Sequence, residues 1–123
     1  MSIPYNMQYK PGLHIIAELS VETVDLIDQY QSAKEAIDKI VSTHQLTNLG
    51  EVYHNFSPVG FTAVICLSES HISMHSWPEY KRLHMDVYLS NFEKDNTQTT
   101  QSIFEELVSF FGATIINQQT LKR

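Results

Sequence analysis

Two segments in the second half of the sequence alternate between apolar and polar residues, and this alternation is the strongest constraint on the fold. Residues 71–77 and 82–90 each place apolar side chains at every second position, with polar or ionisable side chains between them. A period of two is typical of β-strands with one buried face. The apolar members of the second segment are Leu83, Met85, Val87 and Leu89. We therefore expect a sheet with one apolar face, which another layer must cover.

The rest of the chain supplies both the further strands and the covering layer. Residues 24–44 and the segment around 103–111 repeat apolar side chains every three or four positions, as amphipathic helices do. Four more segments are predicted as strands, at residues 13–19, 51–56, 61–67 and 113–117. This order predicts an α+β fold: a two-layer αβ sandwich with a largely antiparallel sheet and two helices on one face, built as one domain over residues 1–123.

Composition excludes several classes of partner. Eight Lys and Arg against fourteen Asp and Glu give a net charge of −6, so we expect no nucleic-acid partner and no binding to an anionic membrane. No apolar run resembles a signal peptide or a membrane span. The single cysteine, Cys66, cannot form an internal disulfide, which favours a cytoplasmic location. Its position between Ile65 and Leu67 predicts a buried strand residue.

The polar face of the predicted sheet is rich in aromatic and histidine side chains rather than in lysine, glutamate and threonine. Such a composition indicates a second surface that is covered by another subunit or by a ligand. The residues expected on this face are His14, Glu18, His54, Phe56, His71, Ser73, His75, Trp77, Asp86, Tyr88 and Ser90.

Residue types alone suggest three chemistries that the spacing does not favour. His71 and His75 would lie roughly 13 Å apart on a strand, too far to share one ion, so we predict no metal site. Ser70, His75 and Asp86 contain the groups of a hydrolase triad, but no nucleophile-elbow motif surrounds Ser70. The four glycines are too dispersed to form a phosphate-binding loop.

The most specific pattern is the continuous run of residues 67–80, Leu-Ser-Glu-Ser-His-Ile-Ser-Met-His-Ser-Trp-Pro-Glu-Tyr. It resembles the self-processing segment of the prokaryotic S-adenosylmethionine decarboxylases, a pyruvoyl-dependent family. The resemblance extends to His14 and Glu18 in the first strand, to the segment 54–60, and to Asp86 with its neighbours. It implies the αβ sandwich of that family and a homodimer with active sites near the subunit contact.

The resemblance also implies a mechanism. Decarboxylation of an α-amino acid needs an electron sink, which the family makes from its own chain. By resemblance, the Ser70 hydroxyl attacks the Glu69 carbonyl and forms an ester. β-Elimination of this ester releases residues 1–69 as a separate chain and leaves Ser70 as an N-terminal pyruvoyl group. This group then binds the substrate amine. His75 matches the histidine that assists processing, and Thr62 stands where the family has a serine that stabilises the anionic intermediate.

Three further positions match the substrate-binding residues of the family. Phe56 and Trp77 match aromatic residues near the ligand and suit an adenine ring and a sulfonium cation. Glu79 matches the carboxylate that accepts hydrogen bonds from the ribose hydroxyls. The implied small-molecule substrate is S-adenosylmethionine, decarboxylated for spermidine synthesis.

The sequence departs from the family pattern at three places. Ser90 replaces the cysteine that donates a proton to the carbanion, and a hydroxyl is a far weaker acid than a thiol. Asn91 replaces a glycine, and residues 81–84 bring bulk and two positive charges. Two alternatives therefore remain: a pyruvoyl decarboxylase of a small basic amino acid such as ornithine or arginine, and an unprocessed, non-catalytic homologue that binds a small ligand or a paralogue.

Overall fold

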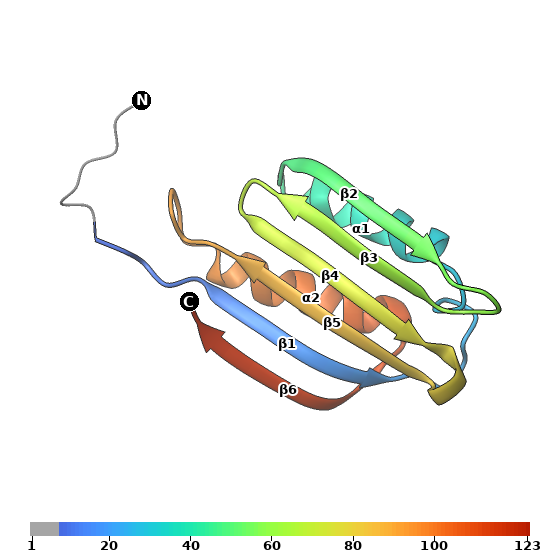
Figure 1. Ribbon diagram of the computed structural model, residues 1–123. Coiled ribbons are helices and arrows are strands. Elements are labelled where there is room, and N and C mark those ends of the chain that lie inside the picture. Colours follow the sequence, from blue (N-terminus) through green and yellow to red (C-terminus); the bar gives the residue numbers. More distant parts are fainter. Residues whose placement is uncertain (1–7) are drawn as a thin grey trace.

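The computed structural model describes residues 8–123, which form one six-stranded antiparallel sheet with two helices behind it (Figure 1). The strand order across the sheet is β2-β3-β4-β5-β1-β6, so the first strand lies between the fifth and the sixth. Both helices cover the same face, which confirms the predicted α+β sandwich. The elements are β1 (Leu13–Ser20), α1 (Gln31–Thr43), β2 (Asn48–Asn55), β3 (Phe61–Leu67), β4 (Ser70–Trp77), a 3₁₀ turn (Pro78–Tyr80), β5 (Arg82–Leu89), α2 (Thr97–Phe111) and β6 (Thr114–Lys122).

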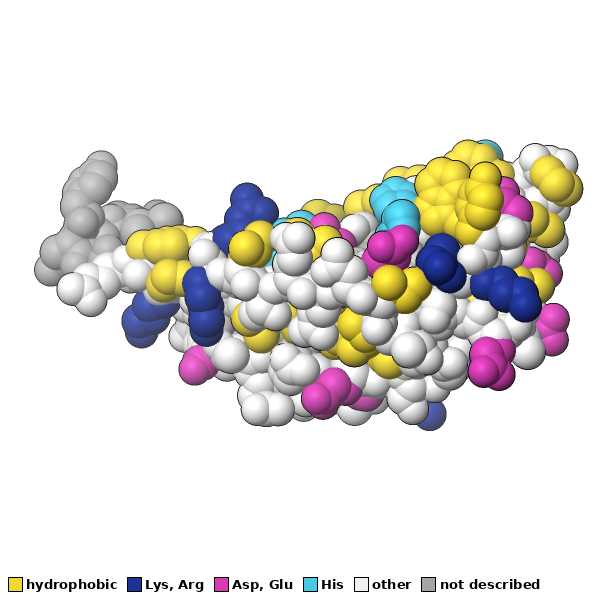
Figure 2. Space-filling view, turned by 90° about the horizontal axis from the view of Figure 1, so that it is seen from below, with side chains coloured by type: hydrophobic (Ala, Val, Ile, Leu, Met, Phe, Trp, Pro, Cys, Tyr) yellow, Lys and Arg dark blue, Asp and Glu magenta, His cyan; other side chains and the backbone are white. Residues whose placement is uncertain are grey.

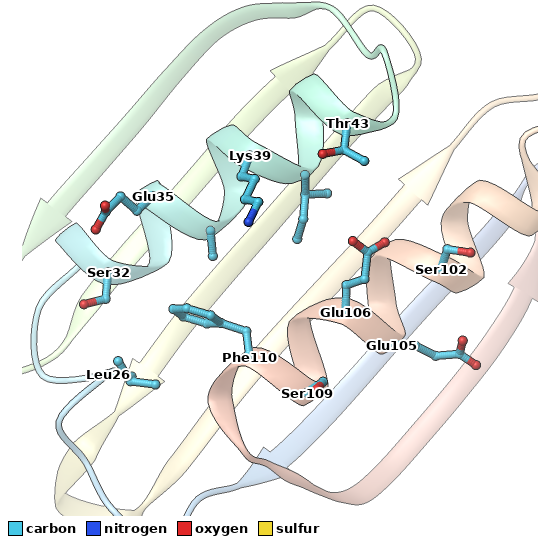
Figure 3. Close-up of a pocket in the computed structure, with 12 residues that line it drawn as sticks. Leu26, Ser32, Glu35, Lys39, Thr43, Ser102, Glu105, Glu106, Ser109 and Phe110 are labelled. Carbon is cyan, nitrogen blue, oxygen red and sulfur yellow. The ribbon is translucent and has the colours of Figure 1, made fainter.

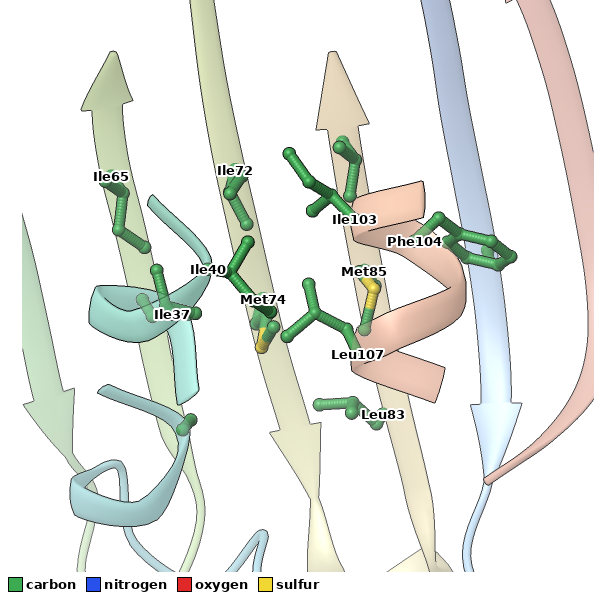
Figure 4. Close-up of a cluster of buried hydrophobic side chains, with 14 of the residues drawn as sticks. Ile37, Ile40, Ile65, Ile72, Met74, Leu83, Met85, Ile103, Phe104 and Leu107 are labelled. Carbon is green, nitrogen blue, oxygen red and sulfur yellow. The ribbon is translucent and has the colours of Figure 1, made fainter. Parts of the chain in front are cut away.

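The hydrophobic core fills the space between the sheet and the helices (Figure 4). The four apolar positions of β5 are at most 2% exposed, as the alternation predicts. Ile37 of α1 and Leu107 of α2 lie over Met74 and Met85 of the two central strands. This packing holds β4 and β5 in the middle of the sheet, where the sequence places the most specific pattern.

The opposite face of the sheet carries no helix. Seen from the β6 side, this face forms the upper margin of Figure 2, where hydrophobic and histidine side chains gather beside charged ones. Three of the large apolar side chains on it are markedly exposed: Val52, Phe56 and Trp77. We call this helix-free surface the open face.

The predicted start of the first helix is wrong, because α1 begins at Gln31 and not near Val24. Two of the preceding residues, Asp28 and Tyr30, use main-chain groups to bond to distant parts of the chain. The Gly60 N–H donates to the Asp28 carbonyl at 2.8 Å, and the Tyr30 N–H donates to Asn55 Oδ1 at 2.7 Å. Ile27 is nevertheless fully buried, which accounts for the helix-like spacing of its apolar neighbours.

Two other predictions need correction. The last strand extends to Lys122 rather than to Asn117, because the polar residues after 117 pair with β1 along the edge of the sheet. Cys66 is exposed and not buried: Ile65 and Leu67 face the helices, so the side chain between them lies on the open face. Within the described residues, neither helix is long and apolar enough to cross a bilayer.

Candidate active site

The Glu69–Ser70 peptide lies in the tight connection between β3 and β4. Leu67 and Ser70 are paired in the sheet, so only two residues form the turn. Ser70 has a φ of 147°, a backbone conformation that residues other than glycine rarely adopt. Backbone held in such a region costs on the order of 1–3 kcal/mol and is concentrated at functional sites. The strain falls on the residue that the sequence identifies as the nucleophile.

Ser90 lies against this turn. Its main-chain N–H donates a hydrogen bond to the Glu69 carbonyl oxygen at 2.7 Å. A small hollow of about 160 Å³ adjoins the contact, with Glu69, Ser90 and Asn96 among its walls. Glu69 Oε1 and Asn96 Oδ1 are both buried with no hydrogen-bond partner in the described part of the chain. The structure therefore brings together three of the predicted catalytic residues: Glu69, Ser70 and Ser90.

Thr62 and His75 form a second pair, on the neighbouring strands β3 and β4. Thr62 Oγ1 lies 3.1 Å from His75 Nδ1, within hydrogen-bonding distance on the open face. His75 is five residues along β4 from Ser70, which corresponds to roughly 16 Å. Within a single chain, the Thr62–His75 pair is therefore distant from the Glu69–Ser70 peptide.

A polar cluster near Ser70, centred on the buried His14 ring, was not identified as a unit from the sequence. His14 Nε2 is hydrogen-bonded to Asp86, His71 Nε2 lies 3.7 Å from the second oxygen of that carboxylate, and Arg123 Nη1 lies 3.2 Å from His14 Nδ1. The Tyr88 hydroxyl donates to the Arg123 carbonyl. Burial and a hydrogen bond with Tyr9 raise the pKa of Tyr88. Pairing of β1 with β5 creates this cluster, and alternation alone does not show which strands are neighbours.

This cluster is also the one group within residues 8–123 with the composition of a metal site, since His14, His71 and Asp86 offer ligand atoms within 4.8 Å of one another. Its hydrogen bonds already account for these groups. A guanidinium can only donate, so His14 Nδ1 accepts from Arg123, and the ring proton on Nε2 points to Asp86. An ion at Nε2 would have to displace that proton and break both bonds.

The predicted substrate-binding residues lie toward the far end of the open face from Ser70. Phe56, at 51% exposed, has its ring centre 4.7 Å from that of His54, and Trp77, at 45% exposed, is 6.3 Å from the ring of His84. Glu79 is exposed in the 3₁₀ turn.

A hollow beside Trp77 shows where the charges of residues 81–84 lie. Glu18, Trp77, Tyr80, Arg82 and His84 line it. Glu18 Oε1 lies 4.0 Å from Arg82 Nε and 3.6 Å from His84 Nε2. The carboxylate therefore lies close enough to Arg82 to offset one of the two positive charges that residues 81–84 bring.

A larger hollow lies on the helix side of the molecule, in the groove between α1 and α2 (Figure 3). Its volume is about 880 Å³, and its lining combines Phe110 and Leu26 with Glu35, Lys39 and Glu106. No histidine or cysteine and none of the predicted site residues line it.

Comparison with known proteins gives one consistent family. Residues 13–123 match the family model described as S-adenosylmethionine decarboxylase. Among curated relatives, the S-adenosylmethionine decarboxylase proenzyme of Archaeoglobus fulgidus is 38% identical over 77 residues, or 63% of this chain and 69% of that protein. The proenzyme of a Hydrogenobaculum species is 43% identical over 77 residues, or 63% of this chain but only 58% of that protein.

Two further similarities cover more of the chain. The proenzyme of Persephonella marina is 36% identical over 101 residues, which are 82% of this chain and 76% of that protein. The crystal structure of the adenosylmethionine decarboxylase from Aquifex aeolicus VF5 superposes with a TM-score of 0.82 at 29% identity, covering 94% of this chain and 92% of that chain.

Proposed function

The chain belongs to the S-adenosylmethionine decarboxylase family, and we propose that it is a proenzyme that cleaves itself between Glu69 and Ser70 and then decarboxylates S-adenosylmethionine. In this proposal residues 1–69 and 70–123 remain together as one domain in the cytoplasm. The product would supply aminopropyl groups for spermidine synthesis. The observation that most supports the proposal is the strained Ser70, whose preceding carbonyl already accepts a hydrogen bond.

Self-cleavage requires a nucleophile next to a carbonyl that is ready for attack. Ser70 Oγ belongs to the residue that follows the Glu69 carbonyl, so the attack closes a five-membered ring. The strain at Ser70 is relieved when its peptide bond is replaced by an ester, which favours the forward reaction. The half-buried site limits access of competing water.

The pyruvoyl group would form from Ser70 and remain between Leu67 and Leu89, its partners in the sheet. When present, such a group withdraws electrons from the substrate amine carbon and so permits the loss of carbon dioxide. Ser90, whose main chain contacts the Glu69 carbonyl, carries an exchangeable side-chain proton. We therefore assign the Ser90 hydroxyl as the proton donor. It is a weaker acid than the cysteine thiol that the family has at this position.

A second copy of the chain would complete the site. Thr62 and His75 are needed near Ser70 but lie roughly 16 Å from it along β4. In a homodimer whose open faces pack together, this pair from one copy can meet Ser70 of the other. The exposed apolar side chains of the open face, including Val52, Phe56 and Trp77, favour such burial.

Substrate binding is assigned to the same face. Phe56 and Trp77 offer exposed aromatic rings for the adenine ring and the sulfonium cation. The exposed Glu79 carboxylate would accept hydrogen bonds from the ribose hydroxyls. Glu18 keeps the neighbouring Arg82 and His84 from opposing a cationic ligand.

The test is release of carbon dioxide from carboxyl-labelled substrates by the purified protein. We expect release from S-adenosylmethionine, and reduction with cyanoborohydride during turnover should attach substrate to the 70–123 chain. Release of carbon dioxide from ornithine or arginine, but not from S-adenosylmethionine, would show that the substrate is a small basic amino acid instead. No release and no adduct with any of the three would contradict the enzymatic function.

A further inference from the structure

The roles proposed above all belong to side chains, and none is given to the main-chain N–H of Ser90. It is 2.7 Å from the Glu69 carbonyl oxygen, the atom on which negative charge develops when Ser70 Oγ attacks. Donors fixed beside such an atom before the reaction lower the barrier, because they need no rearrangement when the charge appears. Thr62, the oxyanion donor expected from the sequence, is bonded to His75 and distant in the same chain.

We infer that the Ser90 main-chain N–H is an oxyanion donor of self-cleavage and that Asn91 and Asn96 are the positioning residues that hold it. This inference rests on the proposed self-cleavage. It assigns to Asn91, which replaces a glycine of the family pattern, a role in the reaction.

Asn91 and Asn96 are linked by hydrogen bonds to each other and to the Ser90–Asn91 peptide, which directly follows the peptide that carries the Ser90 N–H. Asn96 Nδ2 donates to the Ser90 carbonyl at 2.8 Å, and the Asn96 N–H donates to Asn91 Oδ1 at 2.6 Å. Asn91 Nδ2 in turn donates to the Pro11 carbonyl at 2.9 Å. Asn96 is 3% exposed and Asn91 is 8% exposed, so water competes little for these bonds.

The residue before β1, Gly12, contacts the Leu89–Ser90 peptide, which carries the Ser90 N–H itself. A side chain at Gly12 would come within 2.4 Å of the Leu89 carbonyl oxygen, so glycine permits a close backbone contact there. Gly12 also exchanges two main-chain hydrogen bonds with Arg123. The end of β5 is thereby fixed between the chain before β1 and the asparagine pair.

The N–H acts without being consumed. Ser70 Oγ forms a bond to the Glu69 carbonyl carbon and loses its proton to a base, while the carbonyl electron pair moves to the oxygen that Ser90 faces. Collapse of this anion breaks the bond to the Ser70 nitrogen, which takes up a proton, and leaves an ester. Charge on the oxygen rises and falls within this step, so the donor affects its rate and not the products.

The test removes the Ser90 N–H and keeps the Ser90 side chain. Semisynthesis with glyceric acid in place of Ser90 converts that amide to an ester, and intact mass spectrometry follows chain cleavage. We expect cleavage to slow by about 10²–10³-fold, the range for loss of one oxyanion donor. The matched control is an amide-to-ester replacement at Val21, whose N–H donates to the Lys81 carbonyl at 3.1 Å at the opposite end of β5; it should leave the rate unchanged.

Asn96→Asp tests the positioning role, because it keeps the size of the side chain but loses the donor to the Ser90 carbonyl. We expect it to slow cleavage in the normal chain and to have no further effect in the chain with the ester at 90. Additive effects would show that Asn96 acts only on general stability. Normal cleavage with the ester at 90 would overturn the inference alone, whereas an uncut wild-type chain would overturn self-cleavage as well.

Discussion

Cleavage in mixed dimers tests whether Ser70 and His75 act from different copies of the chain. Ser70→Ala removes the nucleophile, and His75→Ala removes the histidine paired with Thr62. Each variant alone should remain uncut. Because β4 separates the two residues by roughly 16 Å, one chain cannot use its own pair, and only a mixed dimer contains one complete site.

The expected yield follows from pairing statistics. Equal amounts of the two chains combine at random, so about half of the His75→Ala chains pair with a Ser70→Ala partner that supplies the missing histidine. About half of the His75→Ala chains should therefore be cut, and no Ser70→Ala chain should be cut. Tags of different mass on co-expressed chains make both fractions measurable by intact mass spectrometry.

A matched control uses the Ser70→Ala/His75→Ala double variant as the partner, which supplies no histidine and should yield no cleavage. Cleavage of His75→Ala in that mixture, or on its own, would show that the histidine is not needed. An uncut mixture of the two single variants, with the wild-type chain cut, would refute a site shared between copies.

Three other predictions concern the proton donor, the charge balance and the core. Ser90→Cys should raise kcat for S-adenosylmethionine by about tenfold or more, since a thiol is the stronger acid; an unchanged kcat would exclude this side chain as the limiting donor. Glu18→Gln should raise KM about fivefold, from about 1 kcal/mol of unbalanced charge near Trp77, with less effect in high salt; an unchanged KM would place the cationic substrate elsewhere. Ser76→Ala should lower the free energy of unfolding by about 2–4 kcal/mol in urea titrations of the uncut Ser70→Ala chain, because the Phe61 N–H and the Ile27 carbonyl both lose a buried partner. Ser73→Ala on the open face is the control for Ser76→Ala, and equal losses from the two would contradict this reason.

Alternation and helical spacing predicted the sandwich because they report which side chains are buried, and burial depends on local position along a strand or helix. The same rule could not locate the start of α1, where Asp28 and Tyr30 bond to Gly60 and Asn55 far along the sequence. The burial predicted for Cys66 was wrong because it was taken from the apolar neighbours Ile65 and Leu67, whereas successive side chains of a strand point to opposite faces.

The candidate site was predictable where one continuous segment specifies it. The run 67–80 identified Glu69, Ser70 and His75. Other parts of the site depend on how segments that are distant in the sequence are arranged. These are the contact of Ser90 with Glu69, the hydrogen bond between Asn91 and Asn96, and the pairing of His14 with Asp86. A single sequence carries no direct record of that arrangement.

The intact mass of the purified wild-type protein tests the central claim most directly. The chain of 14.1 kDa should be replaced by two fragments, residues 1–69 and residues 70–123, and the second should begin with a group that lacks a free amine. Sodium borohydride should add two mass units to that fragment by reducing its terminal ketone. One intact species of 14.1 kDa, or a second fragment that begins with an ordinary serine, would contradict the formation of a pyruvoyl group from Ser70.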